Sequence, residues 1–375
     1  MSELPTRIEG FCARGFEPVR AAFEANFADG FEAGAGFAAV ADGEVVVELW
    51  GGHRDKEGAQ PWNRDTLVPV FSTTKPISAL VVAHLVGRGL MDYEALVADY
   101  WPEWGEDKSS VTLAGVLSHQ AGIPGFANPI DPSLWLNPPA LAAALANLAP
   151  MWKPMTAHGY HPMTWGYLVG ELVLRVAGRS LGRILREELC APLCIDFGIG
   201  LPASEDHRLA RLIRPTELPE LGAISPEKRA AFLTRWAAPD RGAEEWRRVE
   251  IPSANGHGGA VAVAQLYQAY ACQGQIRGVE IVEPEAMRAA LRTRAKGRDL
   301  VLPFDLTWAA GVMRNSGGVY GPNPNALGHS GWGGSMALAD PDRHLSAAYV
   351  MNRQSNKLQG DRRAARLVEA LYACV

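Results

Sequence analysis

Hydrophobic positions near the start of the chain follow two different spacings. Over residues 16 to 30 they recur every three or four positions, which predicts an amphipathic helix. Two β-rich runs between residues 35 and 52 then flank Asp42-Gly43, a dipeptide typical of a two-residue hairpin turn. We therefore predict a helix followed by a tight β-hairpin.

The middle of the chain has helical spacing, interrupted by proline and glycine. Residues 77 to 89 predict a buried helix that ends at a glycine, and a second helix begins near Thr112. His119 falls in the last turn of that second helix, where we interpret it as a C-terminal cap rather than a ligand. Residues 203 to 250 carry the most charge and predict surface helices and loops without a chemical role.

Strand-like segments return around residues 328 to 352, and residues 361 to 373 predict a closing amphipathic helix. The glycine-rich residues 255 to 260 lack the lysine and threonine of a Walker loop, so we interpret them as a tight structural turn rather than a phosphate cradle. A chain that is β-rich at both ends and helical in the middle predicts one sheet built from both terminal segments, with a helical lobe inserted between them.

Composition and charge narrow the range of functions. Of the 375 residues 47% are hydrophobic and 21% are charged, as in ordinary globular proteins, and the net charge is -5. We therefore expect neither nucleic acid nor an anionic membrane as a partner. The N-terminus has no apolar leader run and no uncharged stretch could span a bilayer, so the expected location is cytoplasmic.

No cofactor or metal is expected. The five cysteines are an odd number without paired C-x-x-C spacing, which favours free thiols. The chain has no His-Glu-x-x-His motif, and Gly34-Ala35-Gly36 precedes a hairpin rather than the crossover helix of a dinucleotide site.

Ser72 and Lys75 are the strongest candidates for chemistry. They lie three residues apart between an apolar strand-like run and an apolar helical run, so one helical turn would bring the amine to the hydroxyl. Pro76 suits the first turn of a helix, where backbone N–H groups have no intrahelical partner. Ser225 and Lys228 repeat the spacing, but there we interpret the serine as a helix N-cap.

Three blocks in a fixed order identify a resemblance: Ser72-Thr73-Thr74-Lys75, Tyr160-His161-Pro162 and His329-Ser330-Gly331-Trp332-Gly333-Gly334. Together they resemble the serine β-lactamase and penicillin-binding superfamily, in particular its class C branch and the family VIII carboxylesterases. The resemblance covers about residues 16 to 370. It implies an α/β (α+β) fold with an antiparallel sheet flanked by helices and an inserted all-helical lobe. We expect residues 1–74 and 251–375 to form the sheet domain and 75–250 the helical domain, with the active site at the seam.

The resemblance also implies roles for individual residues. Ser72 would be the acylated nucleophile, Lys75 its activating partner, and Tyr160 the general base, with its anion favoured by Lys75. The backbone N–H groups of Ser72 and Trp332 would form the oxyanion hole. The expected substrate-binding residues are His329, Ser330, Gly331, Trp332, Gly333, His161, Trp165 and Phe71. Trp152 is a further aromatic candidate for an apolar pocket.

Two departures from the β-lactamase pattern bear on the substrate. Pro162 replaces the asparagine that would hold a lactam side chain, and His329 replaces the lysine of Lys-Thr-Gly and is largely neutral at pH 7. Both favour a small, uncharged, short-chain ester, with water as the second reactant. The absence of Gly-x-Ser-x-Gly excludes an α/β-hydrolase nucleophile elbow. The alternatives are a β-lactamase or D-amino-acid peptidase of the same superfamily, and a non-catalytic binding protein or scaffold.

Overall fold

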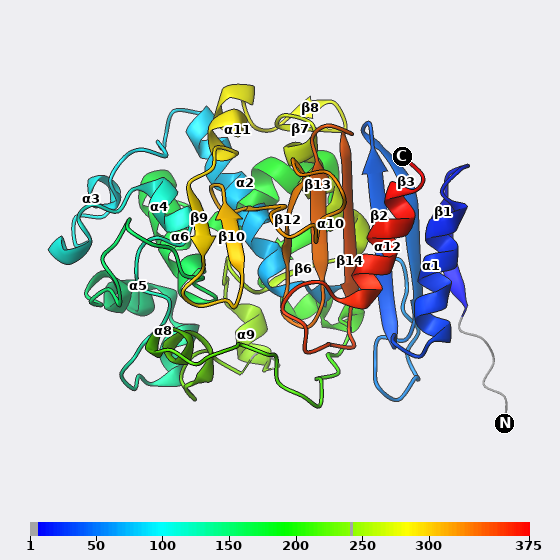
Figure 1. Ribbon diagram of the computed structural model, residues 1–375, viewed down its shortest axis with the longest axis horizontal. Coiled ribbons are helices and arrows are strands. Elements are labelled where there is room, and N and C mark those ends of the chain that lie inside the picture. Colours follow the sequence, from blue (N-terminus) through cyan, green and yellow to red (C-terminus); the bar gives the residue numbers. More distant parts are fainter. Residues whose placement is uncertain (1–6, 241–242) are drawn as a thin grey trace.

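The computed structural model describes residues 7–240 and 243–375 and is built around a nine-stranded antiparallel sheet (Figure 1). In spatial order the strands are β1 (Ile8–Cys12), β3 (Glu44–Gly52), β2 (Gly34–Ala41), β14 (Leu345–Met351), β13 (Met336–Asp340), β12 (Leu327–Ser330), β11 (Met313–Arg314), β10 (Asp305–Trp308) and β9 (Ala295–Arg298). Because β2 pairs with β14, both ends of the chain contribute to one sheet, as predicted. Residues 1–6 of the predicted first segment lie outside the described residues.

Strand β2 shows how the sheet is buried on both faces. Successive side chains of a strand point to opposite faces. Phe37 and Ala39 pack in one core with residues of helices α1 (Glu17–Ala28) and α12 (Arg362–Tyr372), whereas Ala38 and Val40 pack in the other core with helix α10 (Ala260–Ala271). Figure 1 shows α1 and α12 lying across the same side of the sheet. The predicted hairpin is confirmed, with Asp42 and Gly43 at positive φ between β2 and β3.

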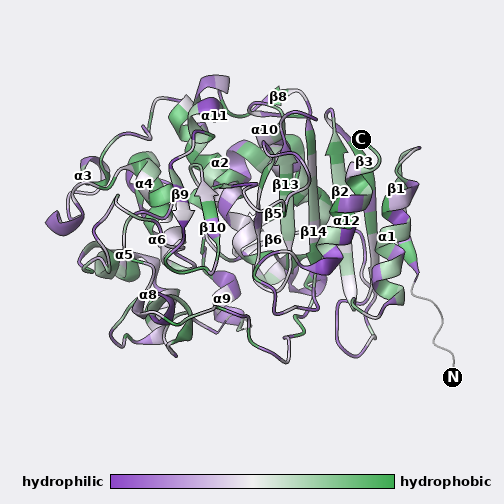
Figure 2. Cartoon of the chain, in the orientation of Figure 1, coloured by the Kyte–Doolittle hydropathy of each residue, from purple (hydrophilic) through white to green (hydrophobic). Residues whose placement is uncertain are grey.

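Helices dominate the chain between the two parts of the sheet. They are α2 (Thr74–Gly87), α3 (Val97–Tyr100), α4 (Leu113–Leu117), α5 (Pro138–Ala146), α6 (Thr164–Ala177), α7 (Leu181–Ile184), α8 (Pro226–Lys228) and α9 (Glu244–Arg248), and α11 (Pro284–Ala290) follows later. Figure 2 shows mostly hydrophobic colouring on the strands of the large sheet and hydrophilic colouring on parts of α12 and α9. The predicted mixed α/β fold with an antiparallel sheet and flanking helices is confirmed. The division into two domains stays a prediction.

A short strand within the helical region corrects two details of the prediction. Strand β5 (Phe197–Ile199) pairs with β6 (Gly256–Gly258), which also pairs with β4 (Val68–Pro69). The helical region is therefore not wholly helical, and the glycine-rich segment is a central strand rather than a turn. Gly256 and Gly258 are needed there because a Cβ at either position would lie 2.5 Å from the ring of Phe197.

No helix within residues 7–240 and 243–375 is both long and apolar enough to cross a membrane. The second Ser-x-x-Lys pair has the structural role expected from sequence. The Ser225 hydroxyl accepts a hydrogen bond from the Lys228 backbone N–H at 3.3 Å and caps α8.

Candidate active site

Ser72 lies where the chain passes from strand β4 into helix α2. A short 3-10 turn, Phe71–Thr73, joins the two elements. Phe71 has a φ of 49°, in the left-handed region that a bulky side chain rarely adopts. Such strain persists only where the surroundings enforce it. Here the Phe71 ring is stacked on Trp246, with centroids 6.0 Å apart.

The start of α2 is held by hydrogen bonds from other elements. Tyr267 and Tyr270 of α10 donate from their hydroxyls to the carbonyls of Thr73 (2.9 Å) and Pro76 (2.6 Å). These bonds link the turn that carries Ser72 to the helix packed beneath the sheet. The position of the serine therefore depends on a segment almost 200 residues away in the sequence.

Ser72, Lys75 and Tyr160 come together as predicted from sequence. The Tyr160 hydroxyl donates to Ser72 Oγ at 2.6 Å, and Lys75 Nζ lies 2.9 Å from the Tyr160 hydroxyl and 3.3 Å from Ser72 Oγ. Lys75 Nζ also donates to the carbonyls of Pro162 (2.9 Å) and Ser253 (3.0 Å). Among the described residues, all four of these hydrogen-bond partners are neutral oxygens.

Burial governs the protonation of this group. It lowers the pKa of Lys75 well below its ordinary value, because removal from water disfavours the charged amine. Burial also raises the pKa of Tyr160, against the weaker opposing effect of the hydrogen bond to Ser72. Burial thus shifts both groups toward their neutral forms. Both directions oppose the expectation that a Lys75 cation stabilises a Tyr160 phenolate, and the role of Tyr160 as general base stays a prediction.

Hydrogen bonds to His119 and to Asp299 hold the segment that carries Tyr160. His119 accepts the Gly159 N–H through its backbone carbonyl (3.1 Å) and the His161 N–H through Nδ1 (3.1 Å). On the other side, Asp299 Oδ1 accepts the Tyr160 N–H at 3.0 Å. The Tyr160 ring itself is stacked on Trp308, 6.0 Å away with an interplanar angle of 8°.

His119 ends α4 as predicted, because its N–H donates to the Val116 carbonyl at 3.2 Å, but its side chain has a further role that was not predicted. Its side chain is completely buried, its φ is 65°, and burial together with the nearby histidines and Lys75 lowers its pKa well below the usual value. The sequence carried no signal for Asp299, which lies in an ordinary charged run. Neither role was predictable, because each depends on contacts with distant segments.

The third block forms the end of β12 and the turn that follows it. Gly334 N–H donates to the Gly331 carbonyl at 3.1 Å, which closes the turn around Trp332. The Ser335 hydroxyl donates to the Val70 carbonyl at 2.8 Å and lies 3.2 Å from the Thr73 hydroxyl. The turn is thus joined directly to the segment that carries Ser72.

A cavity of about 50 Å³ opens beside Ser72. Six of the predicted substrate-binding or oxyanion residues line it: Phe71, Ser72, His329, Ser330, Gly331 and Trp332. The sequence analysis missed other lining residues: Met163, Ala231, Phe232, Ala238, Ala254, Leu302, Met313, Leu358 and Gln359. Ala231 and Phe232 come from the charged region that was expected to have no role, and the Phe232 ring stacks on Trp332 at 6.0 Å.

Four of the predicted binding residues lie outside this cavity lining. His161 is buried and accepts the Ile123 N–H at 3.1 Å, and the Trp165 indole donates to the Leu117 carbonyl at 3.2 Å, so both belong to the scaffold. The Trp152 indole donates to the Ala157 carbonyl at 3.2 Å. Gly333 lies in the turn after β12, with a φ of 88°.

His329 is a neutral wall of the cavity. Burial, with a smaller effect from Lys75, lowers its pKa to about 3. Its Nδ1 lies 2.8 Å from the Ser330 carbonyl and therefore carries the proton. His329 replaces the lysine of the Lys-Thr-Gly motif, so the site has no fixed positive charge at this position.

Known proteins resemble this chain over nearly its full length. The chain is 32% identical to the esterase/beta-lactamase LipL of Mycobacterium tuberculosis, over 92% of this chain and 83% of that protein. A penicillin-binding protein homologue from Caulobacter crescentus has a crystal structure with 51% identity and a TM-score of 0.96, covering 98% of this chain and all of the other. A family VIII carboxylesterase gives 41% identity and a TM-score of 0.91 over the same shares of the two chains.

These neighbours confirm both the fold and the resemblance inferred from the three sequence blocks. The match extends well beyond those blocks, since the family model named Beta-lactamase covers residues 19–371. The chain therefore belongs to the beta-lactamase family of serine hydrolases, with esterases among its relatives.

Proposed function

We propose that this protein is a serine esterase that hydrolyses small, uncharged acyl esters through an acyl-enzyme on Ser72. The observation that carries the proposal is the contact of Ser72 Oγ with both the Tyr160 hydroxyl and the Lys75 amine, at 2.6 and 3.3 Å. A serine needs an adjacent base to act as a nucleophile at neutral pH. In this site we assign that base to the Lys75 amine, whose neutral form burial favours.

Counting protons assigns the roles. A neutral Lys75 amine has two N–H donors and one lone pair. The carbonyls of Pro162 and Ser253 accept the two donors, at 2.9 and 3.0 Å, so the lone pair faces the Tyr160 hydroxyl at 2.9 Å. In the reactive arrangement Tyr160 donates its proton to this lone pair and accepts the proton of Ser72, whose Oγ lies 2.6 Å away. Lys75 therefore acts as the general base, and Tyr160 passes protons between the amine and the reacting oxygens.

The reaction follows from these positions. Ser72 Oγ attacks the ester carbonyl carbon while its proton passes to Lys75, and the carbonyl oxygen becomes an oxyanion. Collapse of this intermediate breaks the bond to the alcohol oxygen, which leaves with a proton returned through Tyr160. Water then attacks the acyl-enzyme by the same route in reverse, releasing the carboxylic acid and restoring Ser72.

The oxyanion would be stabilised by the backbone N–H groups of Ser72 and Trp332. Two features support this assignment. The Trp332 turn is joined to the Ser72 segment through Ser335, and both residues line the same cavity. Two backbone donors fixed in place before the reaction stabilise developing charge without reorganisation.

Replacement of Gly331 with alanine tests the oxyanion assignment. A Cβ at Gly331 would lie 2.1 Å from Ser335 Oγ and 2.4 Å from the Val70 carbonyl oxygen, so the turn must move away from Ser72. We expect kcat to fall about 100-fold, the typical effect of losing one oxyanion donor. Gly317→Ala is the matched control, because its Cβ would meet only Val319 at 3.7 Å. Equal kcat values for the two variants would contradict the assignment.

The cavity supports a small acyl group. Its volume of about 50 Å³ is far below the roughly 300–1,000 Å³ of pockets that bury drug-sized ligands. Its walls are mainly apolar side chains, and neutral His329 offers no ion pair to a substrate carboxylate. A larger hollow of about 640 Å³ shares Ser330, Leu358 and Gln359 with this cavity and has space for a bulkier alcohol portion.

The test is a comparison of substrates on the purified protein. We expect kcat/KM for p-nitrophenyl acetate and butyrate to exceed that for the decanoate and for the cephalosporin nitrocefin. Nitrocefin turnover faster than that of every ester would instead favour a β-lactamase or peptidase. If intact-mass spectrometry with activated esters and penicillins shows no adduct on Ser72, the protein is a non-catalytic binder.

A further inference from the structure

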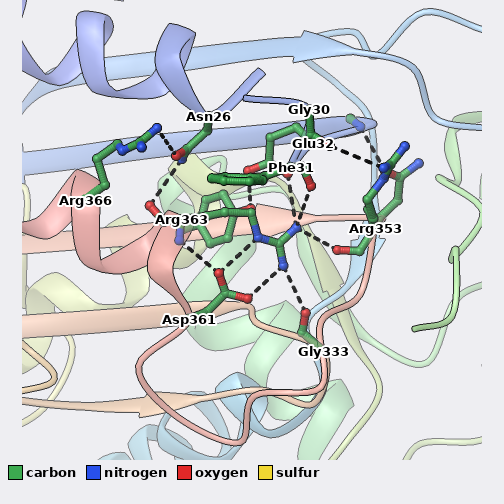
Figure 3. Close-up of polar contacts among 12 residues, drawn as sticks. Asn26, Gly30, Phe31, Glu32, Gly333, Arg353, Asp361, Arg363 and Arg366 are labelled. Atoms are coloured by element: carbon green, nitrogen blue, oxygen red, sulfur yellow. Dashed lines mark hydrogen bonds and ion pairs between the residues drawn. The ribbon is translucent and has the colours of Figure 1, made fainter. Parts of the chain in front are cut away.

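A buried charged cluster contacts the turn that contains Gly333 (Figure 3). Its centre is Arg363, near the start of α12, whose side chain is only 4% exposed. The guanidinium pairs with Asp361 at 2.8 Å and with Glu32 at 3.3 Å, and these carboxylates are 5% and 0% exposed. Tyr349 donates a further hydrogen bond to Glu32.

Stability alone is a weak explanation for such a cluster. Taking charges out of water costs several kcal/mol for each ion, and well-packed apolar residues often replace buried ion pairs at no loss. What apolar residues do not reproduce is the directional set of N–H donors of a guanidinium. The other hydrogen bonds of Arg363 therefore indicate its role.

Arg363 reaches the turn that carries Trp332. Its Nη2 donates to the Gly333 carbonyl at 3.3 Å, and the Ser355 N–H donates to the same carbonyl at 2.8 Å. The approach is close: a Cβ on Gly334 would lie 2.9 Å from Arg363 Nη2 and 2.5 Å from Asp361 Oδ2. The same guanidinium donates to the Arg353 carbonyl at 2.8 Å, which ties the segment after β14 to this point.

The turn is therefore fixed at both ends. On the Ser72 side, Ser335 joins it to Val70 and Thr73, and on the far side Arg363 and Ser355 hold the Gly333 carbonyl. Trp332 lies between Gly331, whose N–H donates to the Ser335 carbonyl at 2.7 Å, and Gly333, whose carbonyl Arg363 holds. Its backbone orientation then depends on both.

We propose that Arg363 is a positioning residue for the oxyanion hole, which holds the Gly333 carbonyl and thereby aims the Trp332 N–H at the carbonyl oxygen of a bound ester. The proposal rests on the proposed esterase function. Arg363 does not touch the substrate, and it acts through the turn. Its loss is expected to weaken transition-state binding more than ground-state binding.

The test compares Arg363→Met with Arg366→Met. Arg366 lies on the same helix and pairs with Asn26 and Asp29 at 3.1 and 2.7 Å, away from the turn, as Figure 3 shows for Asn26. We expect Arg363→Met to lower kcat about 10- to 100-fold, with KM changed less than about 3-fold. Binding of a small alkylboronic acid, whose tetrahedral adduct on Ser72 mimics the intermediate, should weaken in parallel with kcat. Arg366→Met should leave both quantities within about 2-fold.

Two milder variants keep the test decisive if Arg363→Met fails to fold. Arg363→Lys keeps the charge without the guanidinium geometry, and Glu32→Gln keeps the size of the partner without its charge. Each should shift kcat and boronic acid affinity in the same direction by a smaller factor. Unchanged values in the folded Arg363 variants, with an active wild-type enzyme, would overturn this inference alone. A wild-type protein that hydrolyses no ester and forms no boronate adduct would overturn the proposed function itself.

Discussion

Replacing Ser72 with alanine is expected to lower kcat/KM for p-nitrophenyl butyrate by at least about 10⁴-fold, because the nucleophile is lost and the remaining groups supply only binding and oxyanion stabilisation. The Ser72 hydroxyl is half-buried and contacts Tyr160 and Lys75. Removing it leaves the turn anchored by Tyr267 and Tyr270 unchanged. The variant should therefore fold normally, as circular dichroism and thermal unfolding can establish.

Ser225→Ala is the matched control, because it removes a serine from the other Ser-x-x-Lys pair. Ser225 caps α8 through the Lys228 N–H, so its loss should cost about 1 kcal/mol of unfolding free energy. Its kcat/KM should stay within about 2-fold of the wild-type value. If Ser72→Ala kept activity near that of the unmodified chain, the acyl-enzyme assignment would be untenable.

Replacing Lys75 with methionine is expected to lower kcat/KM by about 10³-fold, the typical contribution of a positioned general base. Methionine fills similar space but has no lone pair of comparable basicity. In the wild-type enzyme kcat/KM should rise as the pH rises through the lowered pKa of Lys75, because only the neutral amine accepts the Ser72 proton. The variant should lose this acidic limb from its pH profile.

The stability of the same pair of proteins gives an independent check on Lys75. Its folded pKa lies below the unfolded value of about 10.4, so the unfolded chain binds more protons between these two pKa values. The unfolding free energy of the wild type, relative to Lys75→Met, should therefore increase as the pH rises through this interval. Urea unfolding at several pH values measures it. A relative stability that falls with rising pH would show that Lys75 is held as a cation.

Local signals in the sequence predicted the architecture well. The Asp42-Gly43 turn requires positive φ angles, so its hairpin followed from two residues. Strand β6 was missed, because a glycine-rich segment is typical of a turn and its pairing depends on β4 and β5 from distant parts of the chain. The cavity-lining residues Ala231 and Phe232 were also missed. They belong to a short apolar run within the charged region after residue 203, and so short a run has no periodic signal.

The sequence by itself determined the chemical groups: a serine and a lysine one helical turn apart, a tyrosine delivered by a turn, and a glycine-rich turn after a strand. Spacing along a helix fixes which side chains can meet, so Ser72 and Lys75 followed from local geometry. Only the tertiary structure decided their protonation and support. Burial favours the neutral forms of Lys75 and Tyr160, and His119, Asp299 and Arg363 contact segments far from them in the chain. Burial and long-range contacts are properties of the packed molecule, and no local pattern encodes them.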